Sequence, residues 1–265
     1  MAAVLELLAV AMVLSLAMAL AWTIARKPGM SGWTDAIWTY AMGACGITLA
    51  LGAGIGSHIQ RRLLVALLVG GWSSRLGTHM LMRALKGKDD PRYIELHRQW
   101  GTAWKVRLFI FLQIQAAAAF GLLIAVFVAA RNPAPTFAWS DWAGAALMAL
   151  GVAGESVADE QLRRFAANPA NKGKINDKGL WRLSRHPNYF FEWLGWWAYP
   201  VIAIGPSGGP NWGWAAIVGP ALIYLLLAHA SGIPPTEAHM LESRGEAFRA
   251  YQRRVNAFFL GPRKR

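Results

Sequence analysis

Acidic residues and cysteine are scarce in this chain of 265 residues. It contains 14 Asp and Glu residues against 27 Lys and Arg residues, and a single cysteine, Cys45. One cysteine excludes an intrachain disulfide. No polar stretch is long enough to bury a core of its own, which excludes a separate soluble domain. We therefore expect one domain over residues 1–265.

The common nucleotide and metal motifs are also missing. There is no P-loop, and the GAGIG stretch at 52–56 lies in an apolar segment with no preceding strand, so it indicates close packing instead of a dinucleotide fingerprint. The six histidines lack HxxH or HxxxH spacing, and we expect no metal site. Spacing shows no Ser-His-Asp arrangement, and Cys45 is expected to be a packed thiol.

Long apolar segments dominate the sequence. Hydrophobic residues make up 55% of the chain and charged residues only 15%, and the mean hydropathy is +0.30. Runs of about 20 apolar residues predict transmembrane helices. We expect an all-α polytopic membrane protein with about seven spans, at 3–25, 33–56, 63–84, 106–130, 141–162, 188–204 and 212–232. The first lacks a basic leader and a clear cleavage site before Arg26, so we expect a retained helix.

The positive charge is concentrated on one predicted side of the membrane. Of the 27 Lys and Arg residues, 23 fall in four segments, 26–27, 83–107, 163–185 and 244–265. The positive-inside rule then predicts an external N-terminus and a cytoplasmic C-terminus. Arg61, Arg62 and Arg131 oppose the trend. The net charge of +13 is expected to meet anionic membrane lipids, not nucleic acid.

The end of the chain has a different pattern. Residues 236–259 alternate apolar and charged residues with a nearly helical period. This pattern is typical of an amphipathic helix that lies on a membrane surface or folds back over it. We expect this helix on the cytoplasmic face.

Ionisable residues recur at helical spacing inside three predicted spans. Pro187 suits the first turn of a helix, which places Asn188 and Glu192 one turn apart on one face. Each such residue is costly in a bilayer and is a functional candidate, although an interhelical ion-pair network is an equally good explanation. The other two stripes are Trp72, Arg75, His79 and Arg83, and Glu155, Asp159 and Arg163.

All three stripes lie toward the predicted cytoplasmic ends of their helices, so we expect one polar cavity open to the cytosol. Guanidinium groups match phosphate oxygens, while carboxylates and amides suit hydroxyls and carboxamides. A nucleotide cofactor is the expected ligand. The arginines expected in the cavity are Arg75, Arg163, Arg182 and Arg185.

Four stretches carry a resemblance to a known family: WTDAIW, GKDDPRYIELHRQWG, GLWRLSRHPNYFFEW and GEAFRAYQRRVNAFF. With these motifs the chain resembles bacterial membrane proteins of the steroid 5α-reductase family, of the 3-oxo-5α-steroid 4-dehydrogenase type, also grouped as DUF1295. The resemblance covers most of the chain and is strongest from about 151 to 260. It implies a single transmembrane reductase domain in which a seven-helix bundle holds NADPH and reduces a lipidic enone.

The resemblance also implies roles for individual residues. Asn188 and Glu192 match a pair at the nicotinamide end, and Arg182, Arg185 and His186 match a loop at the phosphates. The candidate cofactor residues are Arg75, His79, Glu155, Asp159, Arg163, Arg182, Arg185, His186, Asn188, Tyr189, Glu192 and Glu237, and the candidate catalytic residues are Asp35, Trp72 and Glu192.

The chain departs from the animal enzymes at the substrate ketone. A tyrosine of the family corresponds to Trp72, and Asp35 lies near, but not at, the position of a glutamate. A protonated Asp35 could polarise the carbonyl, with Tyr40 and His58 as weaker candidates. The alternative for Asp35 is a carboxylate at a helix terminus near Lys27.

Two other functions stay open. RHPNY, Glu237 and GEAFRAYQRR also resemble isoprenylcysteine and phospholipid methyltransferases, which bind S-adenosylmethionine. A non-catalytic membrane subunit that binds lipid is the third possibility. Spacing identifies neither the physiological substrate nor the oligomeric state.

Overall fold

The structure, a computed structural model, describes residues 1–52, 58–87, 89, 91–205 and 212–264. Within these residues every regular element is helical, which confirms the all-α fold class. Most of the GAGIG stretch lies outside the described residues. The chain forms two compact units, Met1–Ala143 with Tyr199–Gly219, and Gly144–Ala198 with Pro220–Arg265. A single functional domain stays a prediction.

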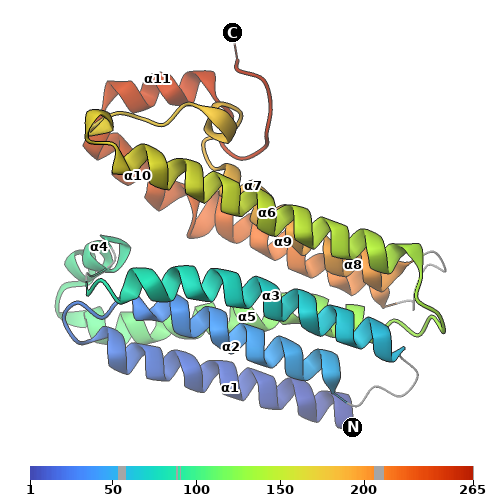
Figure 1. Cartoon of the computed structure of the whole chain (residues 1–265). Coiled ribbons are helices and arrows are strands. Elements are labelled where there is room, and N and C mark those ends of the chain that lie inside the picture. The colour runs from blue at the N-terminus through green and yellow to red at the C-terminus, as the bar shows by residue number, and fades with distance from the viewer. Residues whose placement is uncertain (53–57, 88, 90, 206–211, 265) are drawn as a thin grey trace. The chain divides into compact units, whose positions relative to one another are not determined.

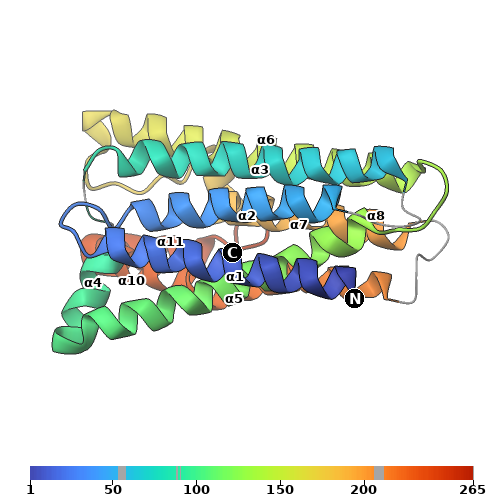
Figure 2. The ribbon, with the colours of Figure 1, turned by 90° about the horizontal axis from the view of Figure 1, so that it is seen from below.

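Four long helices form the first unit. They are α1 (Ala2–Ala25), α2 (Trp33–Leu51), α3 (Ile59–Ala84) and α5 (Trp104–Ala130). They run alongside one another in Figures 1 and 2, with α2 in contact with the other three. The shorter elements are α4 (Pro91–Trp100), η1 (Gly101–Ala103), α8 (Ala198–Ile204) and η4 (Gly213–Ile217).

Helix α1 is apolar on its exposed side as well as its buried side. Leu14 and Met18 are buried one turn apart against the unit. Leu8, Leu16 and Leu20 are each more than half exposed. A helix that is apolar all round has no face suited to water, so this exposed side suits lipid.

Small residues bring α2 and α3 close together. A Cβ atom at Gly43 would lie 2.0 Å from Oγ of Ser73. That hydroxyl donates to the Thr39 carbonyl at 2.9 Å. Close approach of this kind is typical of membrane helix pairs. It places the small-residue face of α2 inside the unit.

Arg61, which opposed the charge trend, is buried beside a carboxylate. Its side chain is 1% exposed and that of Asp141 is 0% exposed, with Nε donating to Oδ1 at 2.7 Å. The guanidinium also donates to the carbonyls of Asn132 at 3.1 Å, Ala134 at 2.8 Å and Thr136 at 2.7 Å. Arg61 therefore fixes the loop before α6 and contributes no free surface charge.

The second unit contains most of α6 (Trp139–Ala167), then α7 (Pro187–Trp196), α9 (Val218–Leu225), α10 (Ile233–Arg244) and α11 (Glu246–Arg254). Short helical turns link them: η2 (Pro169–Asn171), η3 (Gly179–Arg182) and the π-helical η5 (Leu226–Ala230). Helices α6 and α7 touch at glycines, since a Cβ atom on Gly151 would lie 2.7 Å from Cα of Gly195.

Three helical segments of the described chain are long and apolar enough to cross a membrane by length and composition: Ala2–Ala25, Arg92–Ala130 and Gly213–Arg244. They are compatible with a membrane protein. The other four predicted spans also coincide with helices, α2, α3, α6 and the pair α7 and α8. A topology of seven spans stays a prediction.

The single helix expected over 236–259 differs from the structure in two respects, since it is divided in two and its second part, α11, ends at Arg254. It is divided into α10 and α11 at Gly245, which has a φ of +51°. A right-handed helix cannot continue through that conformation. Phe248, Tyr251 and Val255 are buried in a small apolar cluster, so one face of α11 packs within the unit. Its place on a membrane surface stays a prediction.

Candidate functional site

Helix α7 begins at Pro187, as its sequence predicts. Proline lacks an N–H and has a fixed φ, both of which suit the first helical position. Asn188 and Glu192 follow one turn apart on α7, at the spacing expected. The loop that precedes α7 places Arg185 and His186 next to α10.

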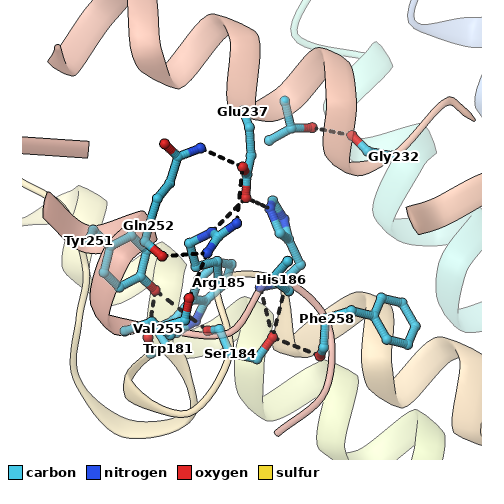
Figure 3. Close-up of polar contacts among 12 residues, drawn as sticks. Trp181, Ser184, Arg185, His186, Gly232, Glu237, Tyr251, Gln252, Val255 and Phe258 are labelled. Atoms are coloured by element: carbon cyan, nitrogen blue, oxygen red, sulfur yellow. Dashed lines mark hydrogen bonds and ion pairs between the residues drawn. The ribbon is translucent and has the colours of Figure 1, made fainter. Parts of the chain in front are cut away.

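The carboxylate of Glu237, in α10, receives four contacts (Figure 3). Arg185 donates from Nε to Oε1 at 2.7 Å and from Nη2 to Oε2 at 3.2 Å. Nε2 of His186 lies 3.0 Å from Oε1, and Gln252 donates to Oε2 at 2.7 Å. The Arg185 and Glu237 side chains are only 10% and 12% exposed. These contacts fill the acceptor positions of the carboxylate.

The guanidinium of Arg185 is also occupied within the protein. Its Nη1 donates to the carbonyls of Gln252 at 3.1 Å and Val255 at 2.6 Å. Its backbone N–H donates to the Asn256 carbonyl at 2.8 Å. Arg185 thus joins the loop before α7 to α10, α11 and the C-terminal tail. A phosphate contact by Arg185 stays a prediction.

Two hydroxyls complete this junction (Figure 3). Ser184 donates from Oγ to the Phe258 carbonyl at 2.8 Å and accepts the His186 N–H at 3.1 Å. Tyr251 donates to the Trp181 carbonyl at 2.5 Å. Burial raises the pKa of Tyr251 well above its usual range, so the phenol stays protonated and remains a donor.

A second polar group lies between α6 and α7. Nδ2 of Asn188 donates to Oδ1 of Asp159 at 3.3 Å. Oδ1 of Asn188 is buried and has no hydrogen-bond partner within the described chain. Glu192 is 8% exposed and accepts a hydrogen bond from Nε1 of Trp196 at 3.0 Å. Glu155, one turn before Asp159, is 7% exposed. The group therefore combines buried carboxylates with one open acceptor.

Two other candidates in this unit have defined surroundings. The Tyr189 ring stacks on the His186 ring, with centroids 5.3 Å apart and an angle of 7° between planes. Arg163 is exposed and donates to Glu160 at 2.6 Å and 2.8 Å. The structure therefore joins Tyr189 to the α7 loop, whereas the hydrogen bonds of Arg163 lie on the surface of α6.

The α3 candidates belong to the first unit. Trp72 is buried and meets the edge of Trp38, with centroids 6.5 Å apart. Arg75 is half-buried and His79 is exposed. Convergence of these residues with those of α6 and α7 stays a prediction.

Asp35 lies in the first turn of α2 and forms an ion pair with Arg92 of α4. The sequence suggested a carboxylate at a helix terminus, with Lys27 as its neighbour; the cation found is Arg92. This ion pair gives Asp35 a role in holding α4 to α2. Its catalytic role stays a prediction.

Sequence reasoning missed Ser184, Tyr251, Gln252 and Arg92. Tyr251 and Gln252 belong to the GEAFRAYQRR motif, but no spacing rule marks which of its residues turn toward the loop before α7. Their position next to Glu237 follows from the fold. In the described chain, no group of three His, Cys, Asp or Glu residues is placed to hold a metal ion.

The described chain defines an all-helical protein with segments apolar enough to span a membrane. The family profile of proteins of unknown function DUF1295 matches residues 21–255, so the chain belongs to the DUF1295 family. A Schizosaccharomyces pombe protein described as "Uncharacterized protein C594.04c" is 27% identical over 264 residues, covering 87% of this chain and 74% of the relative. No solved structure matches the chain significantly.

Proposed function

We propose that the protein is a membrane-embedded, NADPH-dependent reductase of a C=C bond conjugated to a ketone in a lipidic, 3-oxo-Δ4-steroid-like substrate. The observation that carries the proposal is Oδ1 of Asn188, between α6 and α7, which is buried and accepts no hydrogen bond within the described chain. Family membership supports it, because the motifs that resemble steroid 5α-reductases lie within or largely within the matched residues.

The polar group between α6 and α7 suits the carboxamide of a nicotinamide. A buried acceptor without a partner is unfavourable by about 1–3 kcal/mol, and a carboxamide N–H would satisfy Oδ1 of Asn188. Asp159 holds Nδ2 of the same side chain and so fixes which atom is open. The residues that would hold this end of NADPH are Asn188, Asp159 and Glu192.

When bound, NADPH would supply a hydride to the β-carbon of the enone, and a proton from solvent would add at the α-carbon. The chain itself would orient and enclose the reacting groups. Trp196 fixes the Glu192 carboxylate through Nε1, and the Arg185–Glu237 ion pair fixes the loop from which α7 begins. These contacts keep the α7 side chains in one orientation, which favours reaction by proximity.

The membrane topology is part of the proposal. Seven spans with an external N-terminus would place the four basic segments on the cytoplasmic side of a bacterial inner membrane. The exposed apolar side of α1 supports contact with lipid. The burial of Arg61 supports this orientation, because one of the opposing charges is neutralised by Asp141.

Glu192→Gln should weaken NADPH binding or lower the reductase rate at least about tenfold. Glutamine keeps an oxygen for Trp196 but removes the charge. The measurement is thermal stabilisation of the purified protein by NADPH, NADH and S-adenosylmethionine, because a ligand that binds only the folded state raises its stability. Glu160→Gln, on the exposed surface of α6, is the matched control.

Each outcome of this comparison has a defined meaning. Stabilisation of the wild type by NADPH, reduced in Glu192→Gln and retained in Glu160→Gln, supports the proposal. Stabilisation by S-adenosylmethionine alone would replace it with methyl transfer. If none of the three compounds stabilises the protein, a non-catalytic membrane subunit is favoured.

Asp35→Asn is expected to abolish turnover of an enone and to leave NADPH binding unchanged. Asparagine retains the size of the side chain. It has no acidic proton to donate to the ketone, and it does not form the ion pair with Arg92. Arg92→Gln separates the two roles, because it removes the ion pair and keeps the acid. Full turnover in Asp35→Asn would remove this residue from the mechanism.

A further inference from the structure

A basic pocket of about 480 Å³ lies where the loop around η3 meets the C-terminal tail. It is lined by Asp177, Lys178, Gly179, Arg182 and Arg263. Three cations face one carboxylate, so the lining has an excess of positive charge. None of these residues belongs to the α6–α7 polar group, and Arg263 lies beyond the residues matched by the family profile.

Both walls of the pocket are held by hydrogen bonds. On the loop side, Leu180 N–H donates to Oε1 of Gln161 at 2.9 Å and Trp181 Nε1 donates to the Ala158 carbonyl at 3.0 Å. On the tail side, Gly261 N–H donates to the Leu183 carbonyl at 3.1 Å. Hydrogen bonds therefore anchor the loop and the tail that line the pocket, in which Lys178 and Arg182 are exposed.

Gly179 is required at the junction of loop and pocket. Its φ is +58°, and a Cβ atom there would lie 2.5 Å from Oε1 of Gln161. A side chain would be strained by the backbone conformation and would disturb the loop anchor. The glycine thus permits the turn that brings Lys178 and Arg182 to the same pocket.

The cationic side chains of the pocket differ in how many hydrogen bonds they form within the protein. Arg263 donates from Nη2 to the carbonyl of Asp177 at 3.0 Å and to its carboxylate at 2.9 Å, and its buried Nε has no partner in the described chain. Within the same residues, neither the Arg182 nor the Lys178 side chain forms a hydrogen bond or ion pair. Arg185, three residues after Arg182, is occupied by Glu237 and two carbonyls.

We propose that this pocket binds a phosphate group through Arg182, Lys178 and Arg263. A guanidinium offers paired N–H donors that match phosphate oxygens, and an ammonium adds a compact positive charge. The phosphate belongs either to a soluble phosphate compound or to the headgroup of an acidic phospholipid. Arg182 is also one of the residues that the family resemblance places at the cofactor phosphates, whereas Lys178 and Arg263 are not, and phosphate binding here does not require hydride transfer.

The test uses the full-length protein in detergent with two probes. Pyrophosphate represents a soluble phosphate, and its binding is measured by thermal stabilisation. Phosphatidylglycerol, compared with phosphatidylcholine, represents a headgroup, and retained lipid is counted by native mass spectrometry. Arg182→Gln and Arg263→Gln should each weaken binding of the effective probe roughly tenfold.

The control variants distinguish binding in this pocket from nonspecific attraction to the basic surface of the protein. Arg249→Gln removes an exposed arginine of α11 that does not line the pocket, and it should bind like the wild type. Arg182→Gln breaks no described hydrogen bond, so its unliganded melting temperature should be unchanged. This variant keeps the test valid if Arg263→Gln disturbs the tail.

Pyrophosphate binding that Arg182→Gln weakens identifies a soluble phosphate compound as a source. Selective retention of phosphatidylglycerol that the same variant loses identifies a headgroup. Binding of neither probe would overturn the proposal. Equal loss in Arg249→Gln would also overturn it, because the attraction would then belong to the whole basic surface. Neither probe contains a nicotinamide, so these results do not depend on the nicotinamide contacts proposed for Asn188.

Discussion

Glu237→Ala is expected to destabilise the second unit by about 3–5 kcal/mol, the usual cost of removing one partner from a buried ion pair. The change leaves Arg185 with an uncompensated charge and removes acceptors from His186 and Gln252. The measurement is the melting temperature in detergent, together with hydrogen exchange in residues 183–187 and in the C-terminal tail. Both segments should exchange faster.

Two variants set the scale for this result. Glu237→Gln keeps oxygen acceptors and should cost less than alanine. Glu246→Ala removes an exposed carboxylate of α11 that pairs with Arg249, and such surface pairs contribute little. A melting temperature of the wild-type value in Glu237→Ala would show that the four contacts do not hold the loop.

Arg61→Met is expected to destabilise the first unit by a similar amount, about 3–5 kcal/mol. It leaves the Asp141 carboxylate buried at 0% exposure and removes donors from the carbonyls of Asn132, Ala134 and Thr136. Stability is measured by unfolding with increasing mole fractions of dodecyl sulfate.

A double variant separates the contribution of the ion pair from that of the hydrogen bonds to the loop carbonyls. Replacing a simple buried ion pair by two apolar side chains often restores stability. Arg61→Met with Asp141→Leu should not recover fully, because the three carbonyls still lack donors. Full recovery would show that the charge pair, and not the loop anchor, is what Arg61 provides. Arg98→Met, on the exposed surface of α4, is the control.

The helices themselves were the most predictable part of the structure. Long apolar runs give α1 and α5 directly, since hydrophobic length and periodicity are local signals. Pro187 also marks the start of α7 correctly. Gly245 divides α10 from α11 where the periodic pattern predicted one helix. A glycine in such a pattern permits a break but does not require one, so sequence alone does not decide it.

The site was predictable in its residue types and less so in its pairings. Asn188 and Asp159 were both expected, and they are hydrogen-bonded. Arg185 was expected at a phosphate, and the structure shows it bonded to Glu237, 52 positions away in the chain. Such a pairing depends on the path between two helices, which no local pattern encodes.

The dependence of residues 183–186 on the C-terminal tail also sets an order of synthesis. Arg185 and Leu183 bond to backbone groups of Asn256 and Gly261, which are synthesised after them. At about 5–20 residues per second, the loop waits roughly 4–15 s for these partners. During that time the polar groups of the loop lack these partners, so the junction forms only after residues 256–261 have been made. A chain truncated before residue 256 is therefore expected to lack this junction.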